Sequence, residues 1–382
     1  MKKQKCKIAE TACCGSQADH DSEASISGSS QNSSIKSKDW IIDTIRCGAG
    51  DVPVVKTTLL ISDRIGSWKA RWTFGRMQYT VPPGLYAVGK PTAKSPVFVS
   101  ANYKMSFDRL RSALNGNHAW IVVLDTKGIN VWCAAGKGTF GTEEIVNRIK
   151  DVRLDKVVSH HKLILPQLGA PGVAAHEVKA SSGFRVIYGP IRASDIPAFL
   201  ESESRATPEM QRIRFPLWDR IVLVPADLML HFKYAIIAAI CFLLLSGFGP
   251  GVYSLDRILS VGISSASLVL TLYVALSVLV PVLLPWLPGR AFSVKGAWLG
   301  SCLAILAGWL VLGHSQVPLS NIMVTGWVLI IVASSSFIAM NFTGTSTYTS
   351  LSGVLKEMRI AVPLQLVGAT VGLVLWITGL FI

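Results

Sequence analysis

A single cysteine in a run of small residues is the feature of this 382-residue chain best suited to chemistry. The run reads Asn130-Val131-Trp132-Cys133-Ala134-Ala135-Gly136-Lys137 and follows the strongly apolar stretch Ala119–Leu124. A thiolate is both a nucleophile and a soft metal ligand, and small neighbours let a large flat ligand approach closely. Core packing is the alternative that the residues alone leave open, because buried cysteine often serves as a small hydrophobe.

The residues around this cysteine predict a turn followed by a very short helix. Asp125–Gly128 is typical of a turn, and Asn130 can then cap a helix over Val131–Ala135. Gly136 suits the left-handed position at the end of that helix. Cys133 would then lie within one helical turn at the edge of a sheet. A strand over Ile129–Trp132 is the alternative, since periodicity does not separate the two over so few residues.

The stretch Gly136–Gly141 matches the G-x-G-x-x-G pattern of dinucleotide-binding loops and precedes a predicted helix. A dinucleotide site also needs an acidic residue about twenty positions later, at the end of the next strand. Asp155 comes too early for that role, and the frame of a P-loop is absent as well. The pattern therefore does not indicate a nucleotide site.

The histidines of the soluble part do not have the spacing of a metal site. His160 and His161 are adjacent, so on a strand they would point to opposite faces. His176 precedes Glu177 but has no second histidine at helical spacing, which excludes the zinc-hydrolase pattern. We interpret these as ordinary polar positions.

Between residues 39 and 228, short apolar runs alternate with turns and amphipathic stretches. Strands are predicted at Val52–Ile61, Ala70–Thr80, Ser95–Val99, Trp120–Leu124, Lys156–Val158 and Phe184–Tyr188. Helices are predicted at Phe107–Leu114, at Glu143–Val152 with Thr142 as N-cap, and at Ile196–Glu201. This alternation favours a Rossmann-like α/β domain with a mainly parallel sheet.

In such a sheet, ligands lie beyond the carboxyl ends of the strands. The loops after Val99, Leu124 and Ile164 are therefore the expected binding region. The third loop, within Leu163–Ala175, is rich in proline and glycine. A rigid loop with little side-chain bulk lets backbone groups approach a large ligand.

Residues 229–382 predict an all-α membrane domain, consistent with a positive mean hydropathy of +0.44. Five apolar stretches are long enough to cross a bilayer: Tyr234–Phe248, Ile258–Val280, Val294–Gly313, Ile322–Phe342 and Ile360–Ile382. These stretches lack the buried charged residues that mark a transport path, which favours an anchor.

The distribution of basic residues predicts the orientation of the chain in a cytoplasmic (inner) membrane. Arg290, Lys295, Lys356 and Arg359 fall in cytoplasmic loops if the soluble part is cytoplasmic and the C-terminus is outside. Residues 1–38 are polar, which predicts a disordered tail without a secretory signal. Cys13 and Cys14 in that tail could capture a soft metal ion, or they could be incidental.

The net charge of +14 does not indicate nucleic-acid binding, because the basic residues are scattered and form no recognised motif. A group near the first apolar stretch, Arg212, Arg214, Arg220 and Lys233, is expected close to anionic headgroups. The seven cysteines include no C-x-x-C pair and no disulfide-framework spacing, which fits a reducing compartment.

Several segments together resemble the HgcA-type corrinoid proteins of microbial mercury methylation. Asn130–Lys137, with the Gly-Thr-Phe-Gly that follows, is similar to the cap-helix motif of that family. Further similar segments are Ser95–Lys104, Leu124–Ile129, Leu163–Lys179 and Asn341–Gly344, so the resemblance runs from about residue 40 to the end. Ser100 and Leu351 stand where that family has threonine and proline.

The resemblance implies a cobalamin-type corrinoid, a methyl–cobalt intermediate, and Cys133 as the lower axial ligand of cobalt. It also implies a fold similar to that of the corrinoid iron–sulfur protein of the acetyl-CoA pathway. The residues expected around the corrinoid are Ser100, Asn102, Tyr103, Asp125, Thr126, Gly128, Asn130, Trp132, Ala134, Ala135, Gly136, Lys137, Gln167, Leu168, Gly169, Ala170, Pro171 and Gly172. Ala134, Ala135 and Gly136 would let the cap lie against the ring, and Trp132 would pack beneath it.

The predicted function is a corrinoid-dependent methyltransferase that moves a methyl group to Hg(II), giving methylmercury. The expected partners are a small ferredoxin-like protein with [4Fe–4S] clusters, which re-reduces cobalt, and a methylated folate or pterin as methyl donor. Two alternatives are a methyl carrier of one-carbon metabolism and a non-catalytic membrane module that binds a corrinoid.

Overall fold

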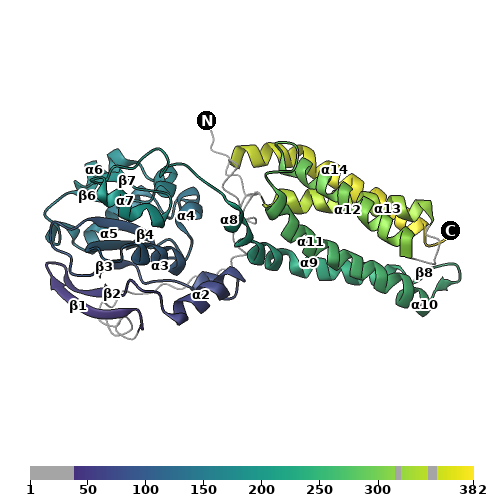
Figure 1. Cartoon of the computed structure of the whole chain (residues 1–382), viewed down its shortest axis with the longest axis horizontal. Coiled ribbons are helices and arrows are strands. Elements are labelled where there is room, and N and C mark those ends of the chain that lie inside the picture. Colours follow the sequence, from purple (N-terminus) through teal and green to yellow (C-terminus); the bar gives the residue numbers. More distant parts are fainter. Residues whose placement is uncertain (1–37, 315–319, 343–350) are drawn as a thin grey trace, which may run out of the picture. The chain divides into compact units, whose positions relative to one another are not determined.

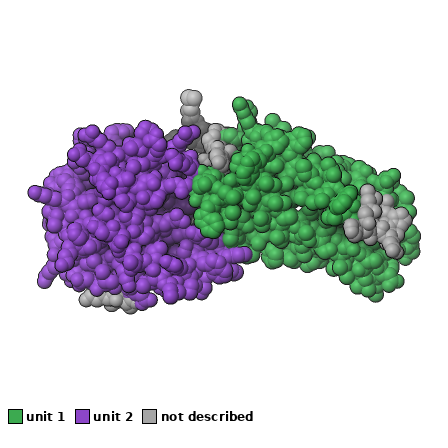
Figure 2. Space-filling model, in the orientation of Figure 1, with its two compact units in different colours: residues 1–17, 215–382 green, residues 18–214 purple. Residues whose placement is uncertain are grey.

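The computed structural model describes residues 38–314, 320–342 and 351–382. The tail predicted over residues 1–38 lies almost wholly outside this range, as do Cys13, Cys14, Thr343 and Gly344. Within the described residues the chain divides into two compact units, and the division falls between Arg214 and Phe215 (Figure 2). Each unit is built on its own core.

The first unit along the described chain, residues 38–214 (unit 2 in Figure 2), is an α/β domain around one seven-stranded sheet with the order β1-β2-β3-β5-β4-β6-β7 (Figure 1). The strands are β1 Ile41–Cys47, β2 Gly50–Val55, β3 Gly84–Val88, β4 Val97–Ala101, β5 Ala119–Leu124, β6 Lys162–Leu165 and β7 Arg185–Tyr188. The β2–β3, β4–β5, β4–β6 and β6–β7 pairs are parallel, whereas β1–β2 and β3–β5 are antiparallel. The predicted α/β fold with a mainly parallel sheet is confirmed.

Helices cover both faces of this sheet, which explains why its central strands are continuous apolar runs. In β5, Trp120, Val122 and Leu124 belong to one core, and Ala119, Ile121 and Val123 belong to the other. The helices are α2 Ile61–Arg71, α3 Lys104–Ala113, α4 Val131–Lys137, α5 Thr142–Asp151, α6 Ala175–Ser182 and α7 Ile196–Glu201. Residues of α4, α5 and α6 pack in the first core, and residues of α3 and α7 pack in the second.

Several predicted elements differ from the structure. The strand predicted at Ala70–Thr80 is wrong: its first residues end α2, and the 3₁₀ helix η1 follows at Arg76–Gln78. Left-handed backbone at Thr73 (φ 64°) and Gly75 (φ 61°) interrupts any extended run there. The strand predicted at Lys156–Val158 is a 3₁₀ turn instead, η2 Leu154–Lys156, and the strand lies later, at β6.

The second unit along the chain, residues 215–382 (unit 1 in Figure 2), contains five helices, among its described residues, that are long and apolar enough to cross a membrane. The long helices are α9 Val224–Leu245, α11 Ile263–Leu283, α12 Phe292–His314, α13 Asn321–Asn341 and α14 Leu351–Thr378. Glycines allow close approach between them, as small residues do in membrane helix pairs. A Cβ added at Gly326 of α13 would lie 2.7 Å from the carbonyl oxygen of Gly372 of α14.

The first of these spans begins earlier than predicted and contains buried charge. It covers Leu217–Leu245, and Arg220 and Asp227 within it are buried. Among the described residues, no buried charged residue lies within the five stretches as predicted; Arg220 and Asp227 belong to the N-terminal extension of the first span, which was assigned to the soluble part. Arg220 Nη1 donates to the carbonyls of Pro281 and Val282, at 2.9 and 2.8 Å, so it satisfies acceptors at the end of α11. This contact gives the arginine a structural role that is compatible with an anchor.

Candidate functional site

The three loops that were expected to bind a ligand begin at one edge of the sheet. Strands β5, β4 and β6 are neighbours and run parallel, so their carboxyl ends point the same way. Asn102 follows β4, Asp125 follows β5 and Gln167 opens the 3₁₀ helix η3, Gln167–Gly172, just after β6. The sheet order therefore gathers segments from positions about 100 to 172 around α4.

Helix α4 carries Cys133 near its start. The side-chain oxygen of Asn130 accepts a hydrogen bond from the Cys133 backbone N–H at 2.9 Å, so Asn130 is the N-cap as predicted. The alternative strand over Ile129–Trp132 is excluded. The helix continues to Lys137, two residues beyond the predicted end, and Gly138 (φ 83°) takes the left-handed position instead of Gly136.

The two sides of α4 have different surroundings. Val131, Ala134 and Ala135, at helical spacing, are buried in the core of the sheet domain. Cys133 and Trp132 are partly exposed, and Gly136 and Lys137 are exposed. The structure thus differs from the expectation that Ala134 and Ala135 line the ligand side and that Trp132 packs beneath the helix. The alanines seat the helix on the core, which leaves Cys133 on a side open to a ligand.

The η3 loop packs directly on the backbone of α4. A Cβ added at Gly172 would lie 2.9 Å from Cα and 3.0 Å from the carbonyl oxygen of Ala135, so only glycine fits without displacement. Similarly, a Cβ added at Gly169 would lie 2.5 Å from Cε1 of the buried Phe140 ring. Leu168 packs against the core, and Ala170 and Pro171 complete the loop. Glycine at both positions therefore allows η3 to pack closely against α4, the helix that carries Cys133.

Gln167, at the start of η3, has a buried side-chain oxygen with no hydrogen-bond partner among the described residues. A buried acceptor without a donor costs about 1–3 kcal/mol. A bound molecule with N–H groups would remove that cost. This orphan oxygen beside the cysteine helix is the observation that best fits an amide-bearing ligand such as a corrinoid.

Asn102 joins the loop after β4 to the loop after β5. Its side-chain oxygen accepts from the backbone N–H groups of Thr126 and Gly128, at 3.2 and 3.0 Å, and from the Thr126 hydroxyl at 2.8 Å. Its amide nitrogen donates to Asp125 at 3.2 Å. Gly128 has a φ of 73°, so a left-handed turn brings its N–H to Asn102. The predicted turn at Asp125–Gly128 is confirmed.

Asp125 is a carboxylate at the rim of these loops. Burial raises its pKa, but hydrogen bonds from the side chain and backbone of Lys127 outweigh burial and hold that pKa below its usual value. Tyr103 is buried and Ser100 is buried within β4, where its hydroxyl donates to the carbonyl of Ala101. Burial raises the pKa of the Tyr103 phenol, so this side chain stays neutral near pH 7.

A further segment, Arg76–Thr80, also borders the site, although it was predicted as a strand elsewhere in the sheet. The carbonyl oxygen of Met77 would lie 2.6 Å from a Cβ added at Gly128, and Thr80 pairs with Tyr103 as an isolated bridge. The Tyr79 carbonyl accepts from the Lys104 backbone N–H at 2.9 Å. This segment therefore holds both the β4 and the β5 loops from one side.

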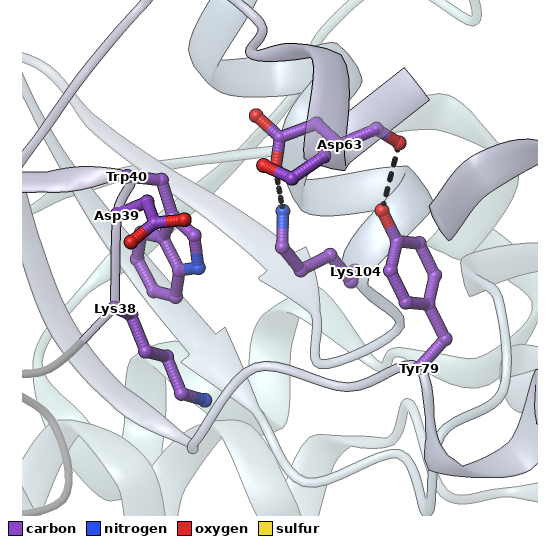
Figure 3. Close-up of a pocket in the computed structure, with 7 residues that line it drawn as sticks. Lys38, Asp39, Trp40, Asp63, Tyr79 and Lys104 are labelled. Carbon is purple, nitrogen blue, oxygen red and sulfur yellow. Dashed lines mark hydrogen bonds and ion pairs between the residues drawn. The ribbon is translucent and has the colours of Figure 1, made fainter. Parts of the chain in front are cut away.

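A buried ion-pair network that sequence reasoning missed lies next to this segment (Figure 3). Lys104 contacts Asp63 and Asp108 at 2.6 and 2.8 Å, and Arg111 contacts the same two carboxylates at 2.6 and 2.7 Å. The Tyr79 hydroxyl donates to the Asp63 carbonyl at 3.0 Å. A small cavity of about 250 Å³ opens beside Asp63 and Lys104. Because Lys104 directly follows Tyr103, the network fixes the loop after β4.

This network predicts an acid-sensitive contribution to stability. Burial raises the pKa of Asp63, but hydrogen bonds from Lys104, the Leu60 N–H and Arg111 outweigh burial and leave the pKa below its usual value. A carboxyl group whose pKa is lower in the folded than in the unfolded protein stabilises the fold at pH values above its unfolded pKa of about 4. This stabilisation is lost as the pH falls through the folded pKa. The thermal midpoint of the unmodified chain should therefore fall as the pH is lowered from about 5 to about 2, and this fall should be smaller in Asp63→Asn.

The thermal midpoint of the α/β unit, followed by near-ultraviolet circular dichroism of the full chain, measures this effect. Asp43→Asn, on the exposed face of β1, is the matched control and should leave the pH profile unchanged. An identical profile for Asp63→Asn and the unmodified chain would contradict the expected role of the Asp63 carboxylate.

The remaining sequence patterns do not form a second site. Gly136–Gly141 ends α4 and leads into α5, where Gly141, not the predicted Thr142, is the N-cap residue. The Thr142 hydroxyl instead accepts from the Ala174 N–H at 2.8 Å. His160 Nε2 lies 2.8 Å from the Ser95 carbonyl oxygen. Within the described residues no group of three His, Cys, Asp or Glu side chains could hold a metal ion.

The part of the chain that contains this site is similar in sequence to known proteins. Residues 67–200 match the family model described as CO dehydrogenase/acetyl-CoA synthase delta subunit. The chain is 28% identical over 156 residues to an acetyl-CoA decarbonylase/synthase complex subunit gamma of Methanopyrus kandleri. It is 30% identical over 136 residues to the corrinoid/iron-sulfur protein large subunit of Moorella thermoacetica.

These similarities cover only part of each protein. The two alignments span 38% and 35% of this chain, and 33% and 30% of the respective relatives. The family model includes β3 to β7 and the whole of α4, whereas all five apolar helices lie beyond it. The α/β unit is thus the part of the chain that is similar to these proteins.

Proposed function

We propose that the α/β unit binds a corrinoid with Cys133 as the lower axial ligand of cobalt, and that the chain transfers a methyl group to Hg(II), giving methylmercury. The observation that carries this proposal is the position of Cys133. It lies on a partly exposed side of a capped helix, among the loops that follow β4, β5 and β6. The same stretch matches relatives that include a corrinoid protein.

The residues of the site have distinct tasks under this proposal. A bound corrinoid supplies the cobalt centre that carries the methyl group. Asn130 orients the first turn of α4, and Gly172 sets the loop that faces it. The Gln167 oxygen accepts from an amide of the ligand, and Asn102 keeps the two flanking loops together. Each of these residues positions the ligand without reacting.

The thiolate of Cys133 is the reason for proposing Hg(II) as the acceptor of the methyl group. Hg(II) is an electrophile, so it takes up a methyl group that leaves with electron density. Cys133 would hold the cobalt through its sulfur, an anionic donor of the kind that soft metal sites prefer, and a bound corrinoid would supply a methyl group of that character. A ferredoxin-like partner with [4Fe–4S] clusters would supply the electrons that a bound corrinoid would need for the next turnover. A methylated folate or pterin would restore the methyl group.

The helices of the second unit are proposed to anchor the protein in a cytoplasmic membrane, with the α/β unit in the cytoplasm and the C-terminus outside. The basic residues at one set of helix ends support this orientation. Arg290, Lys295, Lys356 and Arg359 lie around the start of α12 and the first turns of α14.

Two measurements test the proposed function. The full chain, purified without oxygen, should show the visible absorption of a corrinoid, and this spectrum should change when reductant is added. Cells that produce the chain together with its ferredoxin should convert inorganic Hg(II) to methylmercury. A protein that takes up no corrinoid when cobalamin is supplied would overturn the site assignment.

The second candidate function is a methyl carrier of one-carbon metabolism. The names of the relatives favour it, because several are subunits of acetyl-CoA decarbonylase/synthase complexes. A chain that binds corrinoid and accepts methyl groups from a methylated pterin, but yields no methylmercury in cells with the ferredoxin, would support this function instead.

A further inference from the structure

Helix α2 turns its apolar side chains toward solvent. Ile61, Ile65 and Trp68, spaced four and three residues apart on one side of the helix, are 77%, 49% and 58% exposed. The exposed surface continues past the helix end through Phe74 and Met77, which are 62% and 45% exposed. A soluble helix normally buries such a stripe, so an exposed one marks an interaction surface.

The opposite side of α2 is firmly held, so this orientation is a property of the fold. Asp63 is 4% exposed and forms ion pairs with Lys104 and Arg111. Ala70 is buried, and a Cβ added at Gly66 would lie 2.6 Å from the Tyr79 ring. Small or paired residues therefore face the sheet domain, and rotation of the helix would expose two ion pairs.

Basic residues flank the apolar stripe. Lys69 lies on one side of it, and Arg64 and Arg71 lie on the other, as their helical positions require. Arg76 extends the basic flank into η1. Between residues 59 and 78 Asp63 is the single acidic residue, and its charge is taken up by the buried network. The surface is thus apolar at its centre and positively charged at its rim.

We propose that α2 and the segment through Met77 form a docking surface for the anionic headgroup region of the bilayer. This surface is called the α2 face below. A basic helix with tryptophan and isoleucine on its apolar side is typical of interfacial binding. Lysine and arginine side chains near an anionic surface each add to the attraction between protein and membrane. The apolar helices of the same chain keep the α/β unit close to lipid, which raises the effective concentration.

Docking would also orient the candidate site. Met77 and Thr80 contact Gly128 of the β5 loop, and Tyr79 holds the backbone of Lys104. The α2 face therefore continues directly into the segment that supports both site loops. The inference rests on the proposed membrane anchoring and on the charge and exposure of α2, and not on which ligand Cys133 binds.

Photo-cross-linking of the full chain in lipid nanodiscs tests the α2 face. Trp68 is replaced with the photoreactive amino acid p-benzoylphenylalanine, which suits an exposed aromatic position. In nanodiscs of phosphatidylcholine with phosphatidylglycerol, irradiation should give covalent lipid adducts at position 68, detected by mass spectrometry. The matched control is the same replacement at Ile42 of β1, which is 62% exposed but belongs to no basic helix. Position 42 should give no lipid adduct.

The charge of the rim has its own test. The double variant Arg64→Glu and Lys69→Glu, or nanodiscs of phosphatidylcholine alone, should lower the yield of adducts at position 68 about tenfold. Adducts joining position 68 to a second copy, to another segment of the chain or to an added ferredoxin, in place of lipid, would overturn the proposal. The proposal would also be overturned if the yield of lipid adducts were the same in the double variant, and in nanodiscs of phosphatidylcholine alone, as in the original experiment. The corrinoid spectrum of each variant shows separately whether the site is intact.

Discussion

Replacing Cys133 with alanine is expected to abolish methylmercury formation and to leave the α/β unit folded. Cys133 is partly exposed on α4, and alanine is a strong helix former, so little stability is lost. The chemical loss is large because the substitution removes the proposed ligand of cobalt. Changes to groups that merely orient a metal ligand already reduce activity about 10- to 100-fold, so loss of the ligand itself should exceed about 100-fold.

The measurement is methylmercury produced from inorganic Hg(II) by anaerobic cells that contain the chain and a ferredoxin-like [4Fe–4S] protein as the proposed electron donor. Cys47→Ala is the matched control, because Cys47 is also partly buried in the same unit but belongs to β1, an edge strand that is not among the strands followed by the site loops. This control should keep full activity. Cys133→His should keep part of the activity, since imidazole also binds cobalt, and its visible spectrum should differ from that of the unmodified protein. Full activity of Cys133→Ala would remove the proposed role of the thiolate.

The local sequence around Cys133 was sufficient to predict its position in the fold. Asn130 is a strong N-cap, and the preceding run is too apolar to be anything but a buried strand. The order of strands and helices then predicted the carboxyl edge of the sheet as the binding region. Capping and hydrophobic patterns depend on a few consecutive residues, so they can be recognised without knowledge of contacts between distant residues.

The parts that were not predicted depend on contacts between distant residues. Asp63 pairs with Arg111 across 48 positions of sequence, and no local pattern connects them. The stretch from Ala70 to Thr80 alternates apolar and polar residues like a strand, yet its phenylalanine and methionine, Phe74 and Met77, belong to an exposed surface. Alternation predicts burial on one side, and that assumption fails where apolar residues face outward. Arg220 was assigned to the soluble part because charge ordinarily ends a membrane span.

Arg111→Leu is expected to destabilise the α/β unit more than any other single change of charge discussed above. The Arg111 side chain is fully buried, and besides its two carboxylates it donates to the carbonyls of Lys56 and Thr58. Its removal leaves Asp63 and Asp108 with one remaining cation, Lys104. Breaking a buried ion pair by removing one partner typically costs about 3–5 kcal/mol, because a charge is left without compensation.

Hydrogen exchange of the amides in β4 and α3, in the full chain, measures this cost as a lower free energy of opening. Arg205→Leu is the control, because Arg205 and its partner Glu203 are both 84% exposed and such a pair contributes less than about 1 kcal/mol. Arg111→Lys should fall between the two, since lysine restores the charge but not the forked donor geometry. Because Lys104 adjoins Tyr103, Arg111→Leu should also weaken corrinoid binding. Unchanged exchange in β4 and α3 would show that the network does not hold the site loops.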